Sequence, residues 1–221
     1  MRLERTSHGL VIHSALQYDL RAALRALGRD RAFRRCLVEL ARVRPGESVL
    51  DVGCATGSLA LAAKRTVGAY GSVTGIDPSP AMVARARGKA RRVRRDVTFD
   101  VGVAQQLPYP DGAFDVVLST LVLHHMPHAD LQTAIVEMRR VLTLGGRLLF
   151  VDIDPHHPDN PRSTPHRHAH GRGHGHGVLD LRRIVSLVAD SGFEVVDEGT
   201  VPFRLFRLER LHYVLGTSVS A

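Results

Sequence analysis

Residues 49–57 read VLDVGCATG, and residues 75–77 read GID. Each stretch is an apolar run that ends in an acid, and the first run continues into a small-residue turn that opens a helix. Glycine at positions 53 and 57 lets the backbone bend sharply, and lets a ligand approach the main chain without meeting a Cβ atom. The pattern predicts a nucleoside pocket at the carboxyl ends of two strands, in which Asp77 holds ribose hydroxyls.

The acid before the turn indicates the kind of nucleoside. The dinucleotide fingerprint G-x-G-x-x-G differs from the spacing of Gly53, Ala55 and Gly57. A carboxylate at Asp51 would repel a phosphate but would suit a cationic or amino-acid-bearing nucleoside. The turn therefore favours S-adenosylmethionine over NAD.

The joint order of several motifs resembles the class I S-adenosylmethionine-dependent methyltransferases, in particular the small-molecule group with the ubiquinone and menaquinone C-methyltransferases. These motifs are residues 49–57, 75–82, 104–109, 114–119 and 137–147. The resemblance covers about residues 15–200, and it implies direct in-line methyl transfer to a small-molecule acceptor. Because the sulfonium donor is already activated, no obligatory nucleophile or metal is expected, and no catalytic residue is assigned.

Apolar spacing alternates between helical and strand periods along the chain. Helical spacing predicts two helices before the sheet, over residues 16–27 and 33–41, the second with Asp30 as its cap. Further helices are expected near residues 57–66, 131–142 and 181–190, and another is expected to be capped by Ser79 with Pro80 in its first turn. Strands are expected at residues 48–52, 72–76, 97–101, 114–118, 147–151, 193–196 and 211–215. This order predicts an α/β fold with a doubly wound, Rossmann-like sheet and helices on both faces. The resemblance implies seven strands, mostly parallel, with one antiparallel strand.

The resemblance also implies which residues contact the cofactor. Main-chain groups at Gly53 and Ala55 would lie against its amino-acid end, with Asp51 near the ammonium, although Asp51 could instead cap the turn. Met82 would pack on the adenine face or belong simply to the core. The expected cofactor-binding set is Tyr18, Asp51, Gly53, Cys54, Ala55, Thr56, Gly57, Asp77, Pro78, Met82, Val103, Ala104, Gln105 and Ser119.

Two positions depart from the family pattern. The family places an acid before the alanine of the next strand end, where it accepts a hydrogen bond from the adenine amine, whereas this chain has Val103 before Ala104. Backbone groups there, or the Gln105 side chain, could still read the adenine edge. The absence of the acid should weaken the free energy of cofactor binding by about 0.5 to 1.5 kcal/mol, the net value of one hydrogen bond. Ala55, in place of the middle glycine, is a smaller departure.

The acceptor is expected between residues 119–125 and the amino-terminal helices. Tyr18 resembles the family's amino-terminal tyrosine, which folds over the cofactor as part of a lid, but a simple packing role is the alternative. His124 or His125 could take a proton from the acceptor, or the pair could be structural. Fold does not fix the substrate, so O-, N-, C- and S-methylation all stay open.

A histidine-rich segment follows the fifth strand. Residues 155–177 hold seven histidines among Pro, Gly and Arg without apolar periodicity. They predict a flexible loop over the acceptor side that orders on substrate binding. Weak Zn, Ni or Cu binding is permitted by the histidines, but no metal site is assigned, because cysteine is absent from the segment and Asp159 is its one acid.

Length and composition bound the remaining classes. The 221 residues suit a single methyltransferase domain over 1–221, with residues 1–44 as amino-terminal lid helices. Two cysteines suit a reducing compartment, and no apolar run approaches the ~18 residues of a membrane span. A cytoplasmic protein without a signal peptide or a membrane span is expected. The oligomeric state is left open.

A net charge of +8 raises the question of nucleic acid. The densest basic run, residues 85–95, contains no aromatic residue that could stack on bases, so a solvated helix face is favoured and nucleic acid is not expected. An acidic substrate or a weak polyanion contact stays open.

Two hypotheses from different classes therefore stand: a small-molecule methyltransferase, and a non-catalytic nucleoside- or metal-binding protein on the same scaffold. RNA methylation is a third, and it predicts affinity that falls steeply with salt. Calorimetry with the cofactor, and separately with Zn or Ni, would distinguish the first two.

Overall fold

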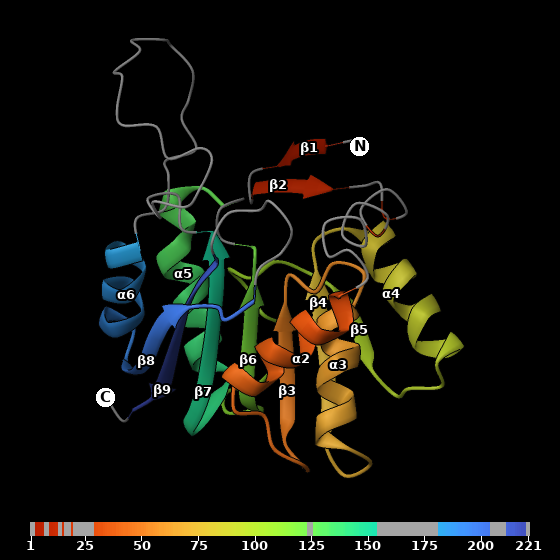
Figure 1. The fold of residues 1–221 in the computed structure, drawn as a ribbon. Helices are drawn as coiled ribbons and strands as arrows, with labels where there is room; N and C mark the ends of the chain where they lie inside the picture. The colour runs from red at the N-terminus through yellow and green to blue at the C-terminus, as the bar shows by residue number, and fades with distance from the viewer. Residues whose placement is uncertain are drawn as a thin grey trace.

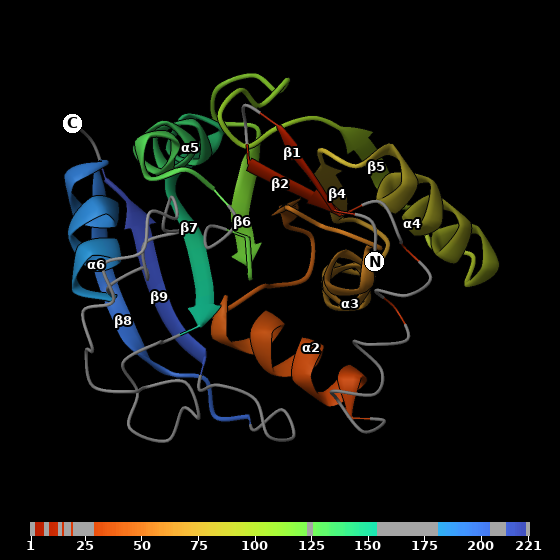
Figure 2. The same cartoon turned by 90° about the horizontal axis from the view of Figure 1, so that it is seen from above.

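The computed structural model describes residues 3–6, 9–12, 15, 19, 29–122, 126–153, 181–203 and 211–219. In this part of the chain, helices cover both faces of a seven-stranded sheet (Figures 1 and 2). The helices are α2 (Asp30–Leu40), α3 (Ser58–Val67), α4 (Pro80–Arg92), α5 (His128–Arg140) and α6 (Leu181–Asp190). The strands of the sheet are β3 (Ser48–Val52), β4 (Ser72–Asp77), β5 (Thr98–Val101), β6 (Phe114–Thr120), β7 (Leu142–Ile153), β8 (Phe193–Thr200) and β9 (Leu211–Ser218).

The strand order is β5-β4-β3-β6-β7-β9-β8. The strands from β5 to β7 in this order pair in parallel, whereas β9 is antiparallel to both of its neighbours. The predicted doubly wound, mostly parallel sheet with one antiparallel strand is confirmed. The chain moves outward from β3 to β5 and then returns to the other side of β3 as β6. Open α/β sheets bind ligands at such a switch point, outside the carboxyl ends of the strands.

The two faces of the sheet have separate cores. One core contains side chains of α2, α3 and α4, among them Leu37 and Val83. The other contains side chains of α5 and α6, among them Ile135 and Val188. Because neighbouring side chains of a strand point to opposite faces, the buried acid of β3 faces the α3 side while its neighbours face α5.

A local signal explains the start of α4 but not that of α2. The hydroxyl of Ser79 accepts a hydrogen bond from the N–H of Met82 at 3.4 Å, and Pro80 is the first residue of α4, as the sequence predicted. The predicted cap at Asp30 is wrong, because α2 begins at Asp30 itself and Arg29 makes no side-chain cap. The Asp30 carboxylate instead accepts hydrogen bonds from Arg34, one turn later.

Other differences from prediction lie at element boundaries. The helical spacing before β7 included Leu142, but this residue pairs with Phe114 as the first residue of the strand. A hairpin of β1 (Leu3–Thr6) and β2 (Gly9–Ile12), which the sequence analysis did not predict, lies above the carboxyl ends of the sheet (Figures 1 and 2). Apart from Asp19, the helix predicted over residues 16–27 lies outside the described residues.

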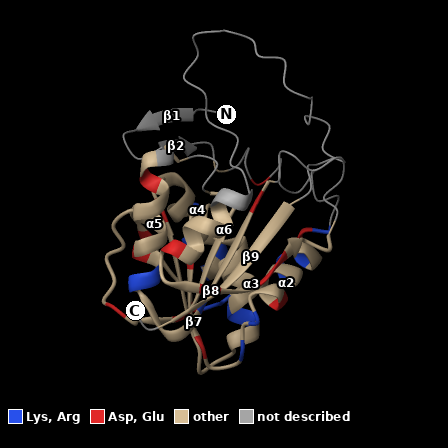
Figure 3. Cartoon of the chain, turned by 90° about the vertical axis from the view of Figure 1, so that its left-hand side faces the viewer, with Lys and Arg blue, Asp and Glu red and all other residues tan. Residues whose placement is uncertain are grey.

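Charged side chains surround this framework. Figure 3 shows largely tan strands, with blue and red segments mixed on the helices and loops around them. The basic run of residues 85–95 is divided: its last arginines are exposed, as expected for a solvated face, whereas Arg85 and Lys89 form ion pairs with Asp19. Within the described ranges, every helix is too short or too polar to cross a bilayer.

Candidate active site

The turn between β3 and α3 contains three residues with left-handed backbone. The φ angle is +72° at Gly53, +47° at Ala55 and +75° at Gly57. At Gly57, a Cβ atom would lie 2.6 Å from the Phe99 ring, so both the backbone and the available space require glycine. The N–H of Gly53 donates to the carbonyl oxygen of Ile76 at 2.8 Å, which ties the turn to β4. The predicted sharp bend is therefore present.

Asp77 ends β4 with its carboxylate against this turn. It is buried; one oxygen accepts from the N–H of Ala55 and the other from the N–H of Ser79, both at 2.9 Å. Burial raises the pKa of Asp77, while the two N–H donors lower it. A carboxylate has about four lone-pair directions, so capacity remains for two hydroxyl donors such as a ribose diol.

Asp51 is the second acid of the site, and it is fully buried under α3. One carboxylate oxygen accepts from the N–H of Ala60 at 3.0 Å. Burial raises the pKa of Asp51 to about 7; Arg34 and the Ala60 N–H act in the opposite direction, and Asp77 adds to the rise. A cationic ligand group at this position would restore the charged carboxylate.

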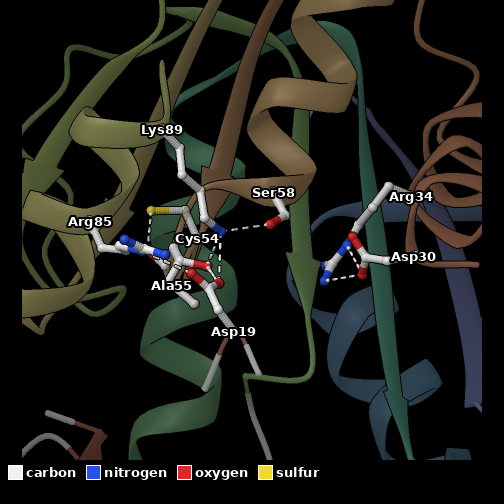
Figure 4. Close-up of polar contacts among 9 residues, drawn as sticks. Asp19, Asp30, Arg34, Cys54, Ala55, Ser58, Arg85 and Lys89 are labelled. Atoms are coloured by element: carbon white, nitrogen blue, oxygen red, sulfur yellow. Dashed lines mark hydrogen bonds and ion pairs between the residues drawn. The ribbon is translucent and has the colours of Figure 1, made fainter. Parts of the chain in front are cut away.

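Arg34 of α2 is a charged residue that the sequence analysis did not assign to the site. Its guanidinium donates to Asp30 at 3.0 and 3.2 Å, and 16% of its side chain is exposed (Figure 4). Its positive charge lowers the pKa of both Asp51 and Lys89. The i,i+4 spacing of Asp30 and Arg34 was visible in the sequence, but it occurs on many exposed helices and does not indicate a site.

Ser119 supplies a test of whether the site suits a polar ligand. Its side chain is fully buried in β6 beside Val52 of β3, and its hydroxyl has no hydrogen-bond partner within the described part of the chain. A buried hydroxyl without a partner costs free energy, so native proteins usually satisfy it with protein, water or ligand. Together with the spare lone pairs of Asp77, it fits a polar ligand at the switch point.

The residues predicted around adenine follow β4 and β5. Ala104 is buried, and Val103 forms an isolated bridge with Gln106. The amide of Gln105 donates to Asp130 of α5 at 3.1 Å. Met82 is buried at the start of α4, while Pro78 is exposed. The adenine contacts assigned to these residues stay predictions.

Thr56 and Cys54 have protein partners at the turn. The hydroxyl of Thr56 donates to Asp19 at 2.6 Å and accepts from Lys89 at 2.7 Å. Any cofactor contact at Thr56 would therefore use its main chain. The Cys54 thiol is buried, which raises its pKa and disfavours the thiolate.

Several predicted residues lie outside the described part of the chain: Tyr18, His124, His125 and the histidine-rich residues 155–177. Elsewhere, the described residues bring together no group of three His, Cys, Asp or Glu side chains that could hold a metal ion.

Comparison with known proteins shows what the residues around this site resemble. Residues 49–146 match the model of a methyltransferase domain. The demethylmenaquinone methyltransferase of Thermus thermophilus is 41% identical over 142 residues, which cover 64% of this chain and 63% of that protein. Over residues 49–146 the chain is therefore similar to a methyltransferase domain. The ubiquinone/menaquinone biosynthesis C-methyltransferase UbiE of Burkholderia mallei is 38% identical over 151 residues, covering 64% of this chain and 58% of that protein. The chain thus spans about 60% of the length of these relatives, and the resemblance to the quinone group is confirmed.

Solved structures agree with the fold of this chain. A SAM dependent methyltransferase from Aquifex aeolicus has a TM-score of 0.68 at 19% identity, covering 93% of this chain and 97% of that chain. The [4+2]-cyclase SpnF has a TM-score of 0.70 at 23% identity, covering 88% of this chain and 82% of that chain. These likenesses show the fold alone, because a fold is shared by proteins of different chemistry.

Proposed function

We propose that the protein transfers a methyl group from S-adenosylmethionine to a ring carbon of a small hydroquinone-type acceptor. The cofactor assignment is supported by the methyltransferase domain over residues 49–146, and the acceptor class by the names of the demethylmenaquinone and ubiquinone/menaquinone relatives. The observation that carries the proposal is the meeting of Asp51, Asp77 and the left-handed turn at one carboxyl edge of the sheet, within the matched residues.

Each part of the site has a proposed task in holding the cofactor. Asp77, oriented by two N–H donors, would accept from the ribose hydroxyls, and the turn would let the methionine portion approach the backbone. Asp51 and Arg34 would meet its ammonium and carboxylate. The proposed cofactor-binding set is that of the sequence analysis, from Tyr18 to Ser119, with Arg34 added.

The chemistry requires positioning more than covalent help. When bound, the cofactor supplies an activated methyl group on a sulfonium. The residues of the chain bind and orient the two reactants so that donor and acceptor stand in line at near-attack distance, and this can supply much of the rate enhancement. Asp51 and Asp77 are both buried, so a ligand that reached them would lose part of its contact with water.

The proposal extends to the segments around the site. Residues 1–44 would act as a lid, and residues 155–177 as a flexible loop over the acceptor side. We place the enzyme in the reducing cytoplasm, because Cys36 and Cys54 both carry free thiols.

The proposal is tested by binding and transfer with a matched pair of variants. Wild-type protein should bind S-adenosylhomocysteine in calorimetry and transfer a radiolabelled methyl group to a water-soluble naphthohydroquinone. Asp77→Ala should weaken binding at least tenfold, because one or more hydrogen bonds to a charged acceptor are lost. Asp96→Ala, at an exposed acid between α4 and β5, should change nothing.

Unchanged affinity in Asp77→Ala would mean that the ribose lies elsewhere. Binding without transfer to any hydroquinone would favour a nucleoside-binding protein, and stoichiometric uptake of Zn or Ni without cofactor binding would favour a metal-binding one.

A further inference from the structure

A cluster of ion pairs joins the amino-terminal segment to the turn. The Asp19 cluster consists of Asp19, Thr56, Ser58, Arg85 and Lys89. Figure 4 labels all of these residues except Thr56. The Asp19 carboxylate accepts from the Thr56 hydroxyl at 2.6 Å, from Lys89 Nζ at 2.7 Å and from Arg85 Nε at 3.0 Å. These partners lie 37 to 70 residues further along the chain.

Lys89 has all of its hydrogen-bond donors directed into this cluster. Its ammonium donates to Asp19 and Thr56, both at 2.7 Å, and to Ser58 at 3.1 Å. An ammonium has three N–H donors, so these acceptors satisfy it completely. Only 23% of the Lys89 side chain is exposed, which makes an unpaired charge at this position costly.

Asp19 also pairs with two like charges on α4 that would otherwise repel each other. Arg85 and Lys89 are four residues apart, so two positive charges face the same side of one helix, an arrangement that destabilises a helix by itself. The carboxylate lies between them and pairs with both. Without Asp19, the two cations would face each other beside the turn.

The cluster leads directly to the proposed cofactor site. Thr56 follows Ala55, whose N–H donates to Asp77, the proposed ribose acid. The Asp19 contact and the contact that orients Asp77 therefore lie on consecutive residues. Asp19 itself follows Tyr18, the residue predicted to fold over the cofactor.

We propose that Asp19 is a positioning residue that holds the cofactor turn in the conformation that orients Asp77, and so slows cofactor release. This inference rests on the proposed function, and it adds the side-chain contacts that position the turn. Asp19 stays outside the reacting atoms and acts through Thr56 and the two cations of α4.

The direct test measures how fast the cofactor product leaves. Protein loaded with tritiated S-adenosylhomocysteine is chased with an excess of unlabelled ligand, and the dissociation rate is compared between variants. Asp19→Asn should raise this rate about tenfold or more, since it removes hydrogen bonds to a charged acceptor. Asp19→Glu should restore part of the effect. Asp96→Asn, at an exposed acid, should leave the rate unchanged.

A second pair of variants guards against a folding defect in Asp19→Asn. Arg85→Gln removes one donor while Lys89 stays paired, so it should raise the dissociation rate by less. Arg91→Gln, on the exposed side of the same helix, should have no effect. Melting temperatures measured in parallel separate stability from release.

The outcomes are distinct. A lowered melting temperature in Asp19→Asn and Arg85→Gln with an unchanged dissociation rate would overturn the inference. The cluster would then contribute to the stability of the fold only. If the wild-type protein bound no S-adenosylhomocysteine at all, the proposed function would fail first, and this inference with it.

Discussion

Asp51→Asn should make the protein more stable at alkaline pH and weaken its hold on the cofactor. The substitution keeps the size of the side chain and an oxygen that can accept from the Ala60 N–H at 3.0 Å, but it removes a fully buried titratable group. Burial, the largest cause, raises the pKa of Asp51 from 3.8 to about 7. The wild-type protein must therefore either protonate this carboxyl or bury its charge.

The sign of the pH dependence follows from linkage. The folded pKa of Asp51 lies above the unfolded one, so its contribution to stability is fully present below about pH 4 and is lost as pH rises through about 7. The interval from 3.8 to about 7, at about 1.4 kcal/mol per pH unit, amounts to about 4 kcal/mol. Asp51→Asn should remove most of this pH-dependent loss, and its advantage should grow between pH 4 and pH 8.

The assay is urea unfolding of wild type and Asp51→Asn at pH 5, 6.5 and 8, with calorimetric titration of S-adenosylhomocysteine at pH 8. We expect the difference in unfolding free energy to widen with pH by several kcal/mol, and the variant to bind the ligand at least tenfold more weakly because the ammonium loses its counter-charge. If the unfolding free energies of the two proteins changed with pH by the same amount, Asp51 would not titrate in this range. Unchanged affinity for the ligand would place the ammonium elsewhere.

Three further substitutions test the packing and the adenine side. Gly57→Ala should lower the unfolding free energy by about 2 to 4 kcal/mol in urea titration, because strain at a φ of +75° adds to a Cβ placed 2.6 Å from a ring; a loss under about 1 kcal/mol would contradict this. Arg147→Met should lower the free energy of unfolding by about 3 to 5 kcal/mol, because it removes the guanidinium that pairs with the mostly buried Glu47 carboxylate at 2.7 Å. A double-mutant cycle with Glu47→Gln that shows no coupling would refute the pairing. Val103→Asp should tighten S-adenosylhomocysteine binding by about 0.5 to 1.5 kcal/mol, because it supplies an acceptor for the adenine amine; weaker binding in calorimetry would move adenine away from residue 103.

Local signals predicted the elements that surround the site. The apolar run before the turn predicted β3 with the observed bounds, and Ser79 followed by Pro80 marked the start of α4. In both cases the signal lies in consecutive residues: an acid after an apolar run, and a hydroxyl side chain before a proline. Such signals can be recognised in the sequence alone.

The features that sequence reasoning missed depend on contacts between distant residues. Asp19 meets cations 66 and 70 residues away, and no local spacing announces such pairs. Leu142 continued a helical pattern, but pairing with Phe114 drew it into β7. Arg34 received no role from the sequence, because its effect on the pKa of Asp51 depends on the tertiary fold. Tertiary context, rather than propensity, determined each of these outcomes.

The insertion of β9 between β7 and β8 bears on how the protein is made. During synthesis, β8 leaves the ribosome first and has no adjacent strand to bond with until Leu211–Ser218 has emerged. Until then the outer edge of β7 is open to other nascent chains, which is a hazard for aggregation. Nonsense mutations or fusion partners that disturb these late residues should therefore reduce the yield of native protein, rather than merely shorten a loose tail.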